Sequence, residues 1–364
     1  MRRSLVLPLL LAALAACQDS VVAPAAPDEA VLARQARTNC QGRCAVTLDG
    51  WLNAANGVRA LNERGEILGM DPAMRWVVQG RSGRRTLQPY PSGYDGTTAR
   101  DLNDRGEVAG NGYRLQGAES GYSAVLWTAA GTLRDLGSFG ARDALVSAMN
   151  DHGDLVGRLR YDDGSSRPFL WSRGKLTLIP LPAGASGEPV DVNKHGQVAG
   201  TWYSAQGARA FVWDRKAGFR DLSDLGGGAG GRAVHAAAIN DHGWVVGSEG
   251  QPGGRGVVSV QTPFLWTPAG GMRSLGSLGG QIARATDVNA RGEVVGEGQT
   301  AGGAFRAFVW SETEGMRVLD ASGDESLAMA INDRGDVLGN VFTRGTGWKA
   351  TVWTRDPAAF STVR

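Results

Sequence analysis

A repeated eight-residue pattern constrains this chain more than any other feature of its sequence. The pattern is Asn-x-x-Gly-x-φ-x-Gly, in which φ is apolar, and it occurs seven times at intervals of 41 to 49 residues. A period in this range is typical of architectures that stack one small structural unit on the next. The seven copies begin at Asn62, Asn103, Asn150, Asn193, Asn240, Asn289 and Asn332.

Each repeat predicts four short antiparallel strands and no helix. In residues 285–320, strands are expected at 285–288, 293–296, 306–310 and 316–319. Asn289 to Gly292 predicts the tight turn between the first two, with Gly at the position of positive φ. Six repeats also carry an apolar residue followed by Trp in the third strand, and Trp76 marks a degenerate version in the first. Such units are typical of propeller blades.

The two ends of the chain predict how the ring closes. The seventh repeat ends after Trp353 without a clear fourth strand, whereas the strand at 45–49 has no repeat of its own. Leu48 lies 14 residues before Asn62, the same spacing as from Leu275 to Asn289. The fold predicted is therefore an all-β, seven-bladed β-propeller of four-stranded antiparallel blades, with the last blade closed by the N-terminal strand. An open solenoid is the alternative, but it would leave sheet edges unpaired.

The N-terminus predicts export. A basic start at Arg2 and Arg3 precedes an apolar run that ends at Cys17. This run is too short for a membrane-spanning helix and is typical of a secretory signal. Leu14-Ala15-Ala16-Cys17 looks like a bacterial lipobox, so Cys17 is the expected site of lipidation. The predicted domains are a signal peptide (1–16), a lipidated flexible stalk (17–39), the propeller (40–356) and a C-terminal tail (357–364).

The two remaining cysteines, Cys40 and Cys44, predict a disulfide in an oxidising compartment. Free thiols are the alternative. A zinc site would need two further Cys or His ligands at short spacing, and the sequence has none. We therefore predict no metal site there.

Three segments of the repeat also carry a resemblance to a known family. They are Ala238-Ile239-Asn240 through Gly247, then Ala307-Phe308-Val309-Trp310, and Leu275 through Gly280. They resemble the extracellular HAF-repeat family, named for a His-Ala-Phe motif, and the likeness covers residues 45 to 355. Arg209 and Arg306 replace the His of that motif, so no role of the His transfers to this chain. The resemblance implies a bacterial exported repeat protein and no particular reaction.

Charge and motifs narrow the possible partners. The 38 basic and 36 acidic residues are interspersed, which disfavours nucleic acid as a partner. The sequence has no nucleophile elbow, His-Glu-x-x-His motif or phosphate loop, and so predicts no cofactor. Contact with the membrane is expected only through the lipid anchor, and the outer membrane of the cell envelope is the expected location of that anchor. The protein is expected to be a monomer.

Few side chains stand out as candidates for chemistry. His152, His195 and His242 occupy the same exposed turn position in three repeats. Asp101, Asp191 and Asp287 lie two residues before the turn Asn in alternate repeats, and around an axis they suggest either a cation site or hydrogen bonds to the neighbouring blade. The off-register Trp51 and Trp348 are predicted to be exposed. The predicted ligand site, on the loop face near the axis, consists of Arg142, Arg232, His235, Arg284 and Glu325.

Three functions fit these observations. The first is a non-catalytic binding or scaffold module, displayed on the cell envelope, that contacts a protein or polysaccharide through its loop face. The second is a polysaccharide hydrolase or lyase with its site at the channel mouth. The third is a purely structural envelope protein.

Overall fold

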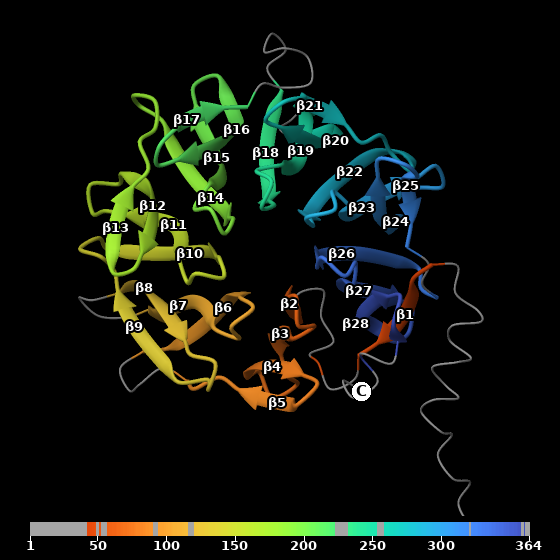
Figure 1. Cartoon of the computed structure of the whole chain (residues 1–364), viewed down its shortest axis with the longest axis horizontal. Coiled ribbons are helices and arrows are strands. Elements are labelled where there is room, and N and C mark those ends of the chain that lie inside the picture. Colours follow the sequence, from red (N-terminus) through yellow and green to blue (C-terminus); the bar gives the residue numbers. More distant parts are fainter. Residues whose placement is uncertain are drawn as a thin grey trace, which may run out of the picture.

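The strands surround a central channel in a β-propeller (Figure 1), seen in a computed structural model. The structure describes residues 42–48, 51, 57–89, 94–115, 120–222, 232–252, 258–319, 322–357 and 360. The predicted signal peptide and stalk, with Cys17 and Cys40, lie outside these residues. Cys44 is disulfide-bonded, and its pairing with Cys40 stays a prediction. No described helix has the length and apolarity needed to cross a membrane.

Each repeat contributes its strands in order from the channel outward. The first strands line the channel and are β2 (Val58–Leu61), β6 (Gly96–Leu102), β10 (Asp143–Met149), β14 (Ser186–Val192), β18 (Ala233–Ile239), β22 (Gly279–Val288) and β26 (Glu325–Ile331). The second strands are β3 (Ile67–Met70), β7 (Val108–Arg114), β11 (Leu155–Arg160), β15 (Val198–Ser204), β19 (Val245–Pro252), β23 (Val294–Thr300) and β27 (Val337–Thr343).

The third strands are β4 (Trp76–Gly80), β8 (Gly121–Trp127), β12 (Ser166–Ser172), β16 (Gly207–Asp214), β20 (Val258–Thr267), β24 (Phe305–Ser311) and β28 (Gly347–Thr354). The outermost strands are β5 (Gly83–Thr86), β9 (Leu133–Gly137), β13 (Lys175–Leu178), β17 (Gly218–Asp221), β21 (Gly271–Ser274) and β25 (Gly315–Val318), with β1 (Cys44–Thr47) in the last repeat.

The prediction of seven separate four-stranded blades is wrong. Hydrogen bonds join the strands into five four-stranded blades and one eight-stranded sheet that runs from β18 to β25. The sheet is continuous because β20 and β22 each extend to ten residues, and their long ends meet in a parallel pair at Gln261 and Ile282. The Arg284 Nε also donates a hydrogen bond to Oε1 of Gln261 across this junction.

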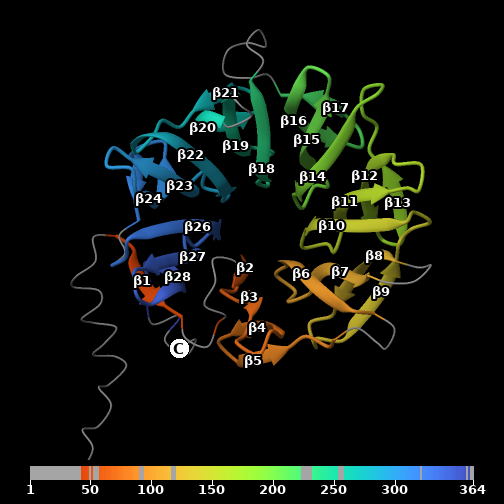
Figure 2. The ribbon, with the colours of Figure 1, turned by 180° about the vertical axis from the view of Figure 1, so that it is seen from behind.

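The N-terminal strand closes the last blade, as the spacing of Leu48 predicts. β1 pairs antiparallel with β28, from Cys44 opposite Thr354 to Thr47 opposite Thr351. The two strands lie side by side in both views (Figures 1 and 2). Without β1, the backbone groups of β28 would form an unpaired sheet edge.

The conserved turn has the geometry that its sequence predicts. The N–H of Gly65 bonds to the carbonyl of Asn62 at 3.0 Å, and the glycine has φ of 76°. The fourth residue of the pattern is in the left-handed region in all seven repeats, with φ between 73° and 85°. Glycine adopts this region without steric cost, which explains its place in the pattern.

The second glycine of the pattern is required by a β-bulge. Each first strand has a register shift just before the turn, as between Ala285 and Asp287. A Cβ at Gly296 would lie 1.9 Å from the carbonyl oxygen of Arg284 and 2.9 Å from the ring of Phe308. The bulge thus brings the backbone of the first strand so close to that of the second strand that only glycine fits between them.

Substitution of this glycine should therefore destabilise the fold. We expect Gly296→Ala to lower the free energy of unfolding by about 1–3 kcal/mol, because the backbone must move to admit the methyl group. The denaturant midpoint measures the loss. Gly302→Ala is the control, because its Cβ would approach nothing closer than 3.9 Å. Equal midpoints for the two variants would contradict the explanation.

The hydrophobic core lies between neighbouring repeats and not within one of them. One cluster joins Leu68 and Trp76 of the first repeat to Val108 and Trp127 of the second. The prediction for Trp51 is wrong, because its side chain is 3% exposed and packs with Val58 and Ile67. Phe360, in the predicted C-terminal tail, is also buried in that cluster.

The seven turn asparagines form a closed ring of hydrogen bonds around the channel. The Nδ2 of Asn62 donates to the carbonyl of Asn103 at 3.0 Å, and each asparagine repeats this bond to the next repeat. Asn332 completes the ring by donating to the carbonyl of Asn62 at 3.3 Å. The side-chain oxygen of each asparagine accepts backbone N–H groups of its own turn. This residue therefore both shapes its turn and links adjacent repeats.

Candidate functional site

The five predicted site residues lie near the loop ends of four first strands and form no cluster through their contacts. Arg142 bonds to Asp143 at 3.1 Å, and Arg232 pairs with Glu249 at 3.3 Å. Arg284 pairs with Glu297 at 3.3 Å. Among the contacts between described residues, none joins two of the five, and Glu325 and His235 also lie on separate strands. Their role as a ligand site stays a prediction.

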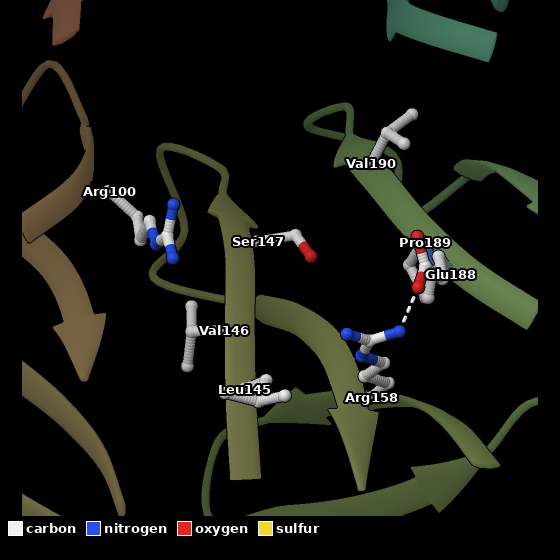
Figure 3. A pocket seen from close by; sticks show the side chains of 8 residues that line it. All are labelled: Arg100, Leu145, Val146, Ser147, Arg158, Glu188, Pro189 and Val190. Carbon is white, nitrogen blue, oxygen red and sulfur yellow. Dashed lines mark hydrogen bonds and ion pairs between the residues drawn. The ribbon is translucent and has the colours of Figure 1, made fainter. Parts of the chain in front are cut away.

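A pocket deeper in the channel brings together a different set of side chains. Its volume is about 370 Å³, and it lies between β6, β10 and β14 (Figure 3). It is lined by Arg100, Leu145, Val146, Ser147, Arg158, Glu188, Pro189 and Val190. Sequence analysis missed every one of these residues.

One wall of the pocket is an ion pair. The Nη1 of Arg158 on β11 donates to Oε1 of Glu188 on β14, and Figure 3 shows the two side chains facing each other. Both side chains are about one-third exposed, at 34% and 42%. Because Glu188 already neutralises Arg158, this pair supplies shape and hydrogen-bonding groups to the pocket without adding net charge.

The opposite wall of the pocket carries Arg100, an arginine that has no carboxylate partner among the described residues. Arg100 is exposed to the channel, and among the described residues no carboxylate bonds to it. Its guanidinium lies beside β10 in Figure 3. The register of β6 shifts between Ala99 and Asp101, so Arg100 is the extra residue of the bulge. A bulge re-aims the side chain it carries, and here it accounts for the position of Arg100 on the channel wall.

The equivalent bulge on β2 carries a second arginine. Arg59 is half-buried, its Nε has no hydrogen-bond partner, and its guanidinium lies 5.9 Å from the centre of the Trp76 ring. Its pKa is lowered by burial and, to a smaller extent, by the charge of Arg100. The two side chains thus repel each other, and an anion near them would relieve this repulsion.

The sequence did hold a signal for this position. Three residues before the turn Asn, the first two repeats have Arg59 and Arg100, whereas the other repeats have smaller or apolar side chains. The importance of this position becomes clear only from the structure, in which the bulge directs its side chain toward the channel. It could be found by comparing the repeats position by position.

His235 extends the polar wall to the next repeat. Its ring lies 6.3 Å from that of Tyr203. Burial lowers the pKa of His235 and so favours the neutral form of its imidazole. Burial raises the pKa of Tyr203, and the charge of Arg158 opposes that shift. His235 thus lies beside Tyr203, whose pKa is influenced by the charge of the pocket residue Arg158.

The turn end of the channel is acidic. A recess of about 400 Å³ there contains the residue that follows each turn asparagine, and five of these seven residues are carboxylic acids. Each carboxylate accepts a backbone N–H of a neighbouring repeat, as Asp104 does from Glu63 at 2.8 Å. The others that do so are Asp151, Asp241, Asp333 and Glu63.

Three more carboxylates link neighbouring first strands. Asp101 accepts the N–H of Met149, Asp191 that of Ile239 and Asp287 that of Ile331, at 2.7 to 2.9 Å. The prediction that they hydrogen-bond to a neighbouring blade is confirmed. In the described part of the chain, no group of three or more His, Cys, Asp or Glu residues has a metal-binding arrangement.

The channel therefore has an electrostatic gradient along its axis. Carboxylates surround the turn end, and the arginines without carboxylate partners lie farther in. An anion meets unfavourable charge at the turn end, so it would reach Arg100 more easily from the loop face.

Comparison with known proteins supports the fold alone. No protein-family model and no curated protein matches the sequence. One similar solved structure is a catalytically inactive variant of virginiamycin B lyase from Staphylococcus aureus with quinupristin. It is 11% identical to this chain with a TM-score of 0.53, and the match covers 85% of this chain and 99% of that one. A prolyl endopeptidase is 13% identical with a TM-score of 0.55, covering 91% of this chain and 53% of that one.

The β-propeller domain of the trilobed protease from Pyrococcus furiosus is similar as well. It is 11% identical with a TM-score of 0.50, and the match covers 81% of this chain and 94% of that domain. At such identities the likeness shows that this chain is a β-propeller and does not carry over an activity.

Proposed function

We propose that this propeller is a non-catalytic binding module, displayed on the bacterial cell envelope by a lipid on Cys17, that takes an anionic group of a protein or polysaccharide into its channel. The observation that carries the proposal is the pair of arginines, Arg59 and Arg100, at the channel wall without carboxylate partners among the described residues. A guanidinium favours planar carboxylates and phosphates because it donates two parallel hydrogen bonds to them.

The shape of the pocket agrees with such a ligand. Leu145, Val146 and Val190 supply apolar surface, while Ser147, Arg158 and Glu188 offer a few polar groups. This combination is common in ligand pockets. A volume near 370 Å³ suits one or two sugar rings or the end of a peptide.

Replacement of Arg100 tests the proposal directly. We expect Arg100→Ala to weaken binding of galacturonate disaccharide, or of a short peptide with a free C-terminal carboxylate, by about 10- to 100-fold, because a hydrogen bond to a charged group contributes about 1.5–3 kcal/mol. Isothermal titration calorimetry of the exported protein measures the affinity. Arg100→Lys should retain part of it, since the charge remains and the planar fork is lost.

Two controls make the result specific. Arg134→Ala removes an exposed arginine from the outer strand β9 and should leave the affinity unchanged. Methyl esters of the same ligands should bind weakly to every variant. Equal affinities for the free acids in Arg100→Ala and in the unsubstituted protein would refute the channel site.

The alternative function is a polysaccharide hydrolase or lyase. The observation that favours it is the neutral imidazole of His235 near Tyr203 and Arg158, because a neutral imidazole can act as a general base. Turnover of a glycan that disappears in His235→Ala, while ligand affinity remains, would support this alternative over a binding module.

A further inference from the structure

A third cavity lies on the turn face between the third and fourth repeats, and it meets the turn-end recess at Lys194. It has a volume of about 770 Å³. We call it the turn-face groove, and it is lined by His152, Asp154, Leu170, Ser172, Arg173, Lys175, Lys194, His195, Gly196, Asp214, Arg215 and Lys216. It shares no lining residue with the channel pocket.

The groove lies where no side chain of the third repeat covers the turn glycine of the fourth repeat. In four repeats the second residue after the turn Asn is an arginine that lies over the turn glycine of the next repeat. Arg64, for example, would lie 2.8 Å from a Cβ on Gly106, and Arg105 2.7 Å from one on Gly153. Arg291 and Arg334 do the same at Gly335 and Gly65.

In the third repeat this position is His152, which does not cover Gly196, the turn glycine of the fourth repeat. Its Nδ1 lies 2.9 Å from the carbonyl oxygen of Lys194. Of the seven turn glycines, all of which are described, Gly196 alone has no atom within 4 Å of where a Cβ would stand. Gln197 and Trp244 occupy the equivalent space at Gly243 and Gly292. The junction of the third and fourth repeats is thus the one junction at which no side chain covers the turn glycine.

The same replacement leaves a buried acceptor without a donor. Glu66, Glu107, Glu293 and Asp336 each pair with the arginine of their own turn, at distances up to 2.8 Å. Asp154 is their equivalent and is 8% exposed, but the third repeat has no such arginine. Its Oδ1 is buried and has no hydrogen-bond partner among the described residues. A buried carboxylate oxygen in this state favours a ligand that supplies a hydroxyl.

The rim of the groove is strongly basic. Three of the four lysines of the whole chain, and two of its four histidines, line it. With Arg173 and Arg215, five permanent cations face two aspartates, whereas the formal net charge of the chain is only +2. Lys194 pairs with Asp241 at 2.9 Å, and the other four cations make no ion pair with a described residue.

We infer that the turn-face groove binds an acidic polysaccharide. Its carboxylates would contact the cations of the rim, and one of its hydroxyls would donate to the carboxylate of Asp154, which lines the groove. This chemistry requires a ligand that carries both negative charges and hydroxyl groups along an extended chain, and an acidic glycan combines them. The inference goes beyond the channel site, because the two cavities are separate and use different residues.

The test uses octagalacturonate as the probe, with its methyl ester as the uncharged comparison. We expect the exported protein to bind the acid and not the ester, and the double variant Arg215→Glu/Lys216→Glu to bind the acid at least tenfold more weakly. Both substituted side chains are exposed, so the fold should be retained. The control Arg81→Glu/Arg134→Glu makes the same change of charge at two other exposed arginines and should bind within twofold of the unsubstituted protein.

A third variant separates the shape of the groove from its charge. His152→Arg restores the arginine found in four other repeats, which would pair with Asp154 and cover Gly196. We expect it to weaken octagalacturonate binding at least fivefold although it adds a positive charge. A merely basic surface would instead bind the anion more tightly.

Each other outcome overturns the inference. Tighter or unchanged binding in His152→Arg, or equal losses in both double variants, would show that charge alone attracts the glycan. Loss of binding only in Arg100→Ala would place the glycan in the channel, in which case the proposed function would stand and the groove would fail. Absence of octagalacturonate binding, with or without binding to phosphatidylglycerol vesicles, would also reject the acidic polysaccharide.

Discussion

Replacing Asn332 by Ala should lower the free energy of unfolding by about 3 kcal/mol, because it removes three hydrogen bonds that contribute about 1 kcal/mol each. The asparagine is 1% exposed. Its Oδ1 accepts the N–H of Asp336, and its Nδ2 donates to Asp336 and to the carbonyl of Asn62. Alanine removes all three bonds and leaves the N–H of Asp336 without an acceptor.

The location of Asn332 adds a second, measurable consequence. Its bond to Asn62 joins residues 270 positions apart, at the junction of the last repeat and the first. We expect amide hydrogen exchange in β1 and β28 to accelerate in Asn332→Ala, since this junction is held by contacts between the two ends of the chain. Asn193→Ala, which breaks the equivalent bond to Asn240, should lose similar stability and leave exchange in β1 unchanged.

The denaturant midpoint and hydrogen exchange by mass spectrometry make these measurements. A loss of stability below about 1 kcal/mol in both variants would mean that the asparagine ring contributes no more than an exposed hydrogen bond.

The second large effect is a loss of stability as the pH rises. Burial raises the pKa of Asp287 to about 7 and that of Asp191 to about 6, and repulsion from a nearby carboxylate adds to each shift, from Asp191 for Asp287 and from Asp101 for Asp191. The pKa of Asp101 is raised for the same reasons of burial, and that of Glu63 is raised to about 7. These groups keep their protons in the folded state at a pH where the unfolded chain has released them.

The direction of the effect follows from proton linkage. Stability from these groups is complete below about pH 4 and is lost as the pH rises through 6 and 7, since the folded state binds more protons in that interval. One pKa unit corresponds to about 1.4 kcal/mol. The aspartates retain some contact with solvent in the channel. We therefore expect a total loss of only about 2 kcal/mol between pH 5 and pH 8.

Other shifted groups do not reverse this trend. The pKa of Glu293 is lowered to about 2 by hydrogen bonds and ion pairs that outweigh its burial, so its contribution is already complete above pH 5. The lowered pKa of His235 acts in the opposite direction, because stability from that group increases as the pH rises toward 6.5. His235 is one group, whereas five carboxylates have raised pKa values, because burial also raises the pKa of Asp104.

Asp287→Asn tests the assignment. The amide cannot ionise, so the decline of stability between pH 5 and pH 8 should be shallower in this variant. At pH 5 the variant should be less stable by about 1–3 kcal/mol, because the amide can accept only one of the N–H groups of Val288 and Ile331. Urea unfolding at four pH values gives both quantities. Asp135→Asn, at an exposed residue of β9, should keep the original slope, and the same slope in Asp287→Asn would contradict the assignment.

Local features were accessible from the sequence because they depend on neighbours along the chain. The Asn-x-x-Gly turn was predicted from residue type, and its glycine has the expected positive φ in every repeat. The spacing of Leu48 predicted that β1 would pair in the last blade, and it does. Period, turn chemistry and strand order thus follow from the sequence by itself.

Contacts between repeats were not accessible in this way. The invariant asparagine was interpreted as a turn residue, and its bond to the next repeat appears only when seven turns face a common axis. The fusion of the strands from β18 to β25 into one sheet depends on how far β20 and β22 extend, which their residue types do not indicate.

The candidate sites, too, could be predicted from the sequence only in part. From the sequence, His235 was predicted near the channel mouth, but Arg100, Arg158 and Glu188 belong to three strands whose meeting depends on the bulge and on the curvature of the ring. The turn-face groove likewise depends on a missing side chain, since the third repeat leaves open a space that an arginine fills at four other junctions and Gln197 and Trp244 fill at two. Sequence alone determined the repeat, the turns and the closing strand through short-range geometry, whereas tertiary structure decided which side chains of different repeats meet, because that depends on distances across the ring.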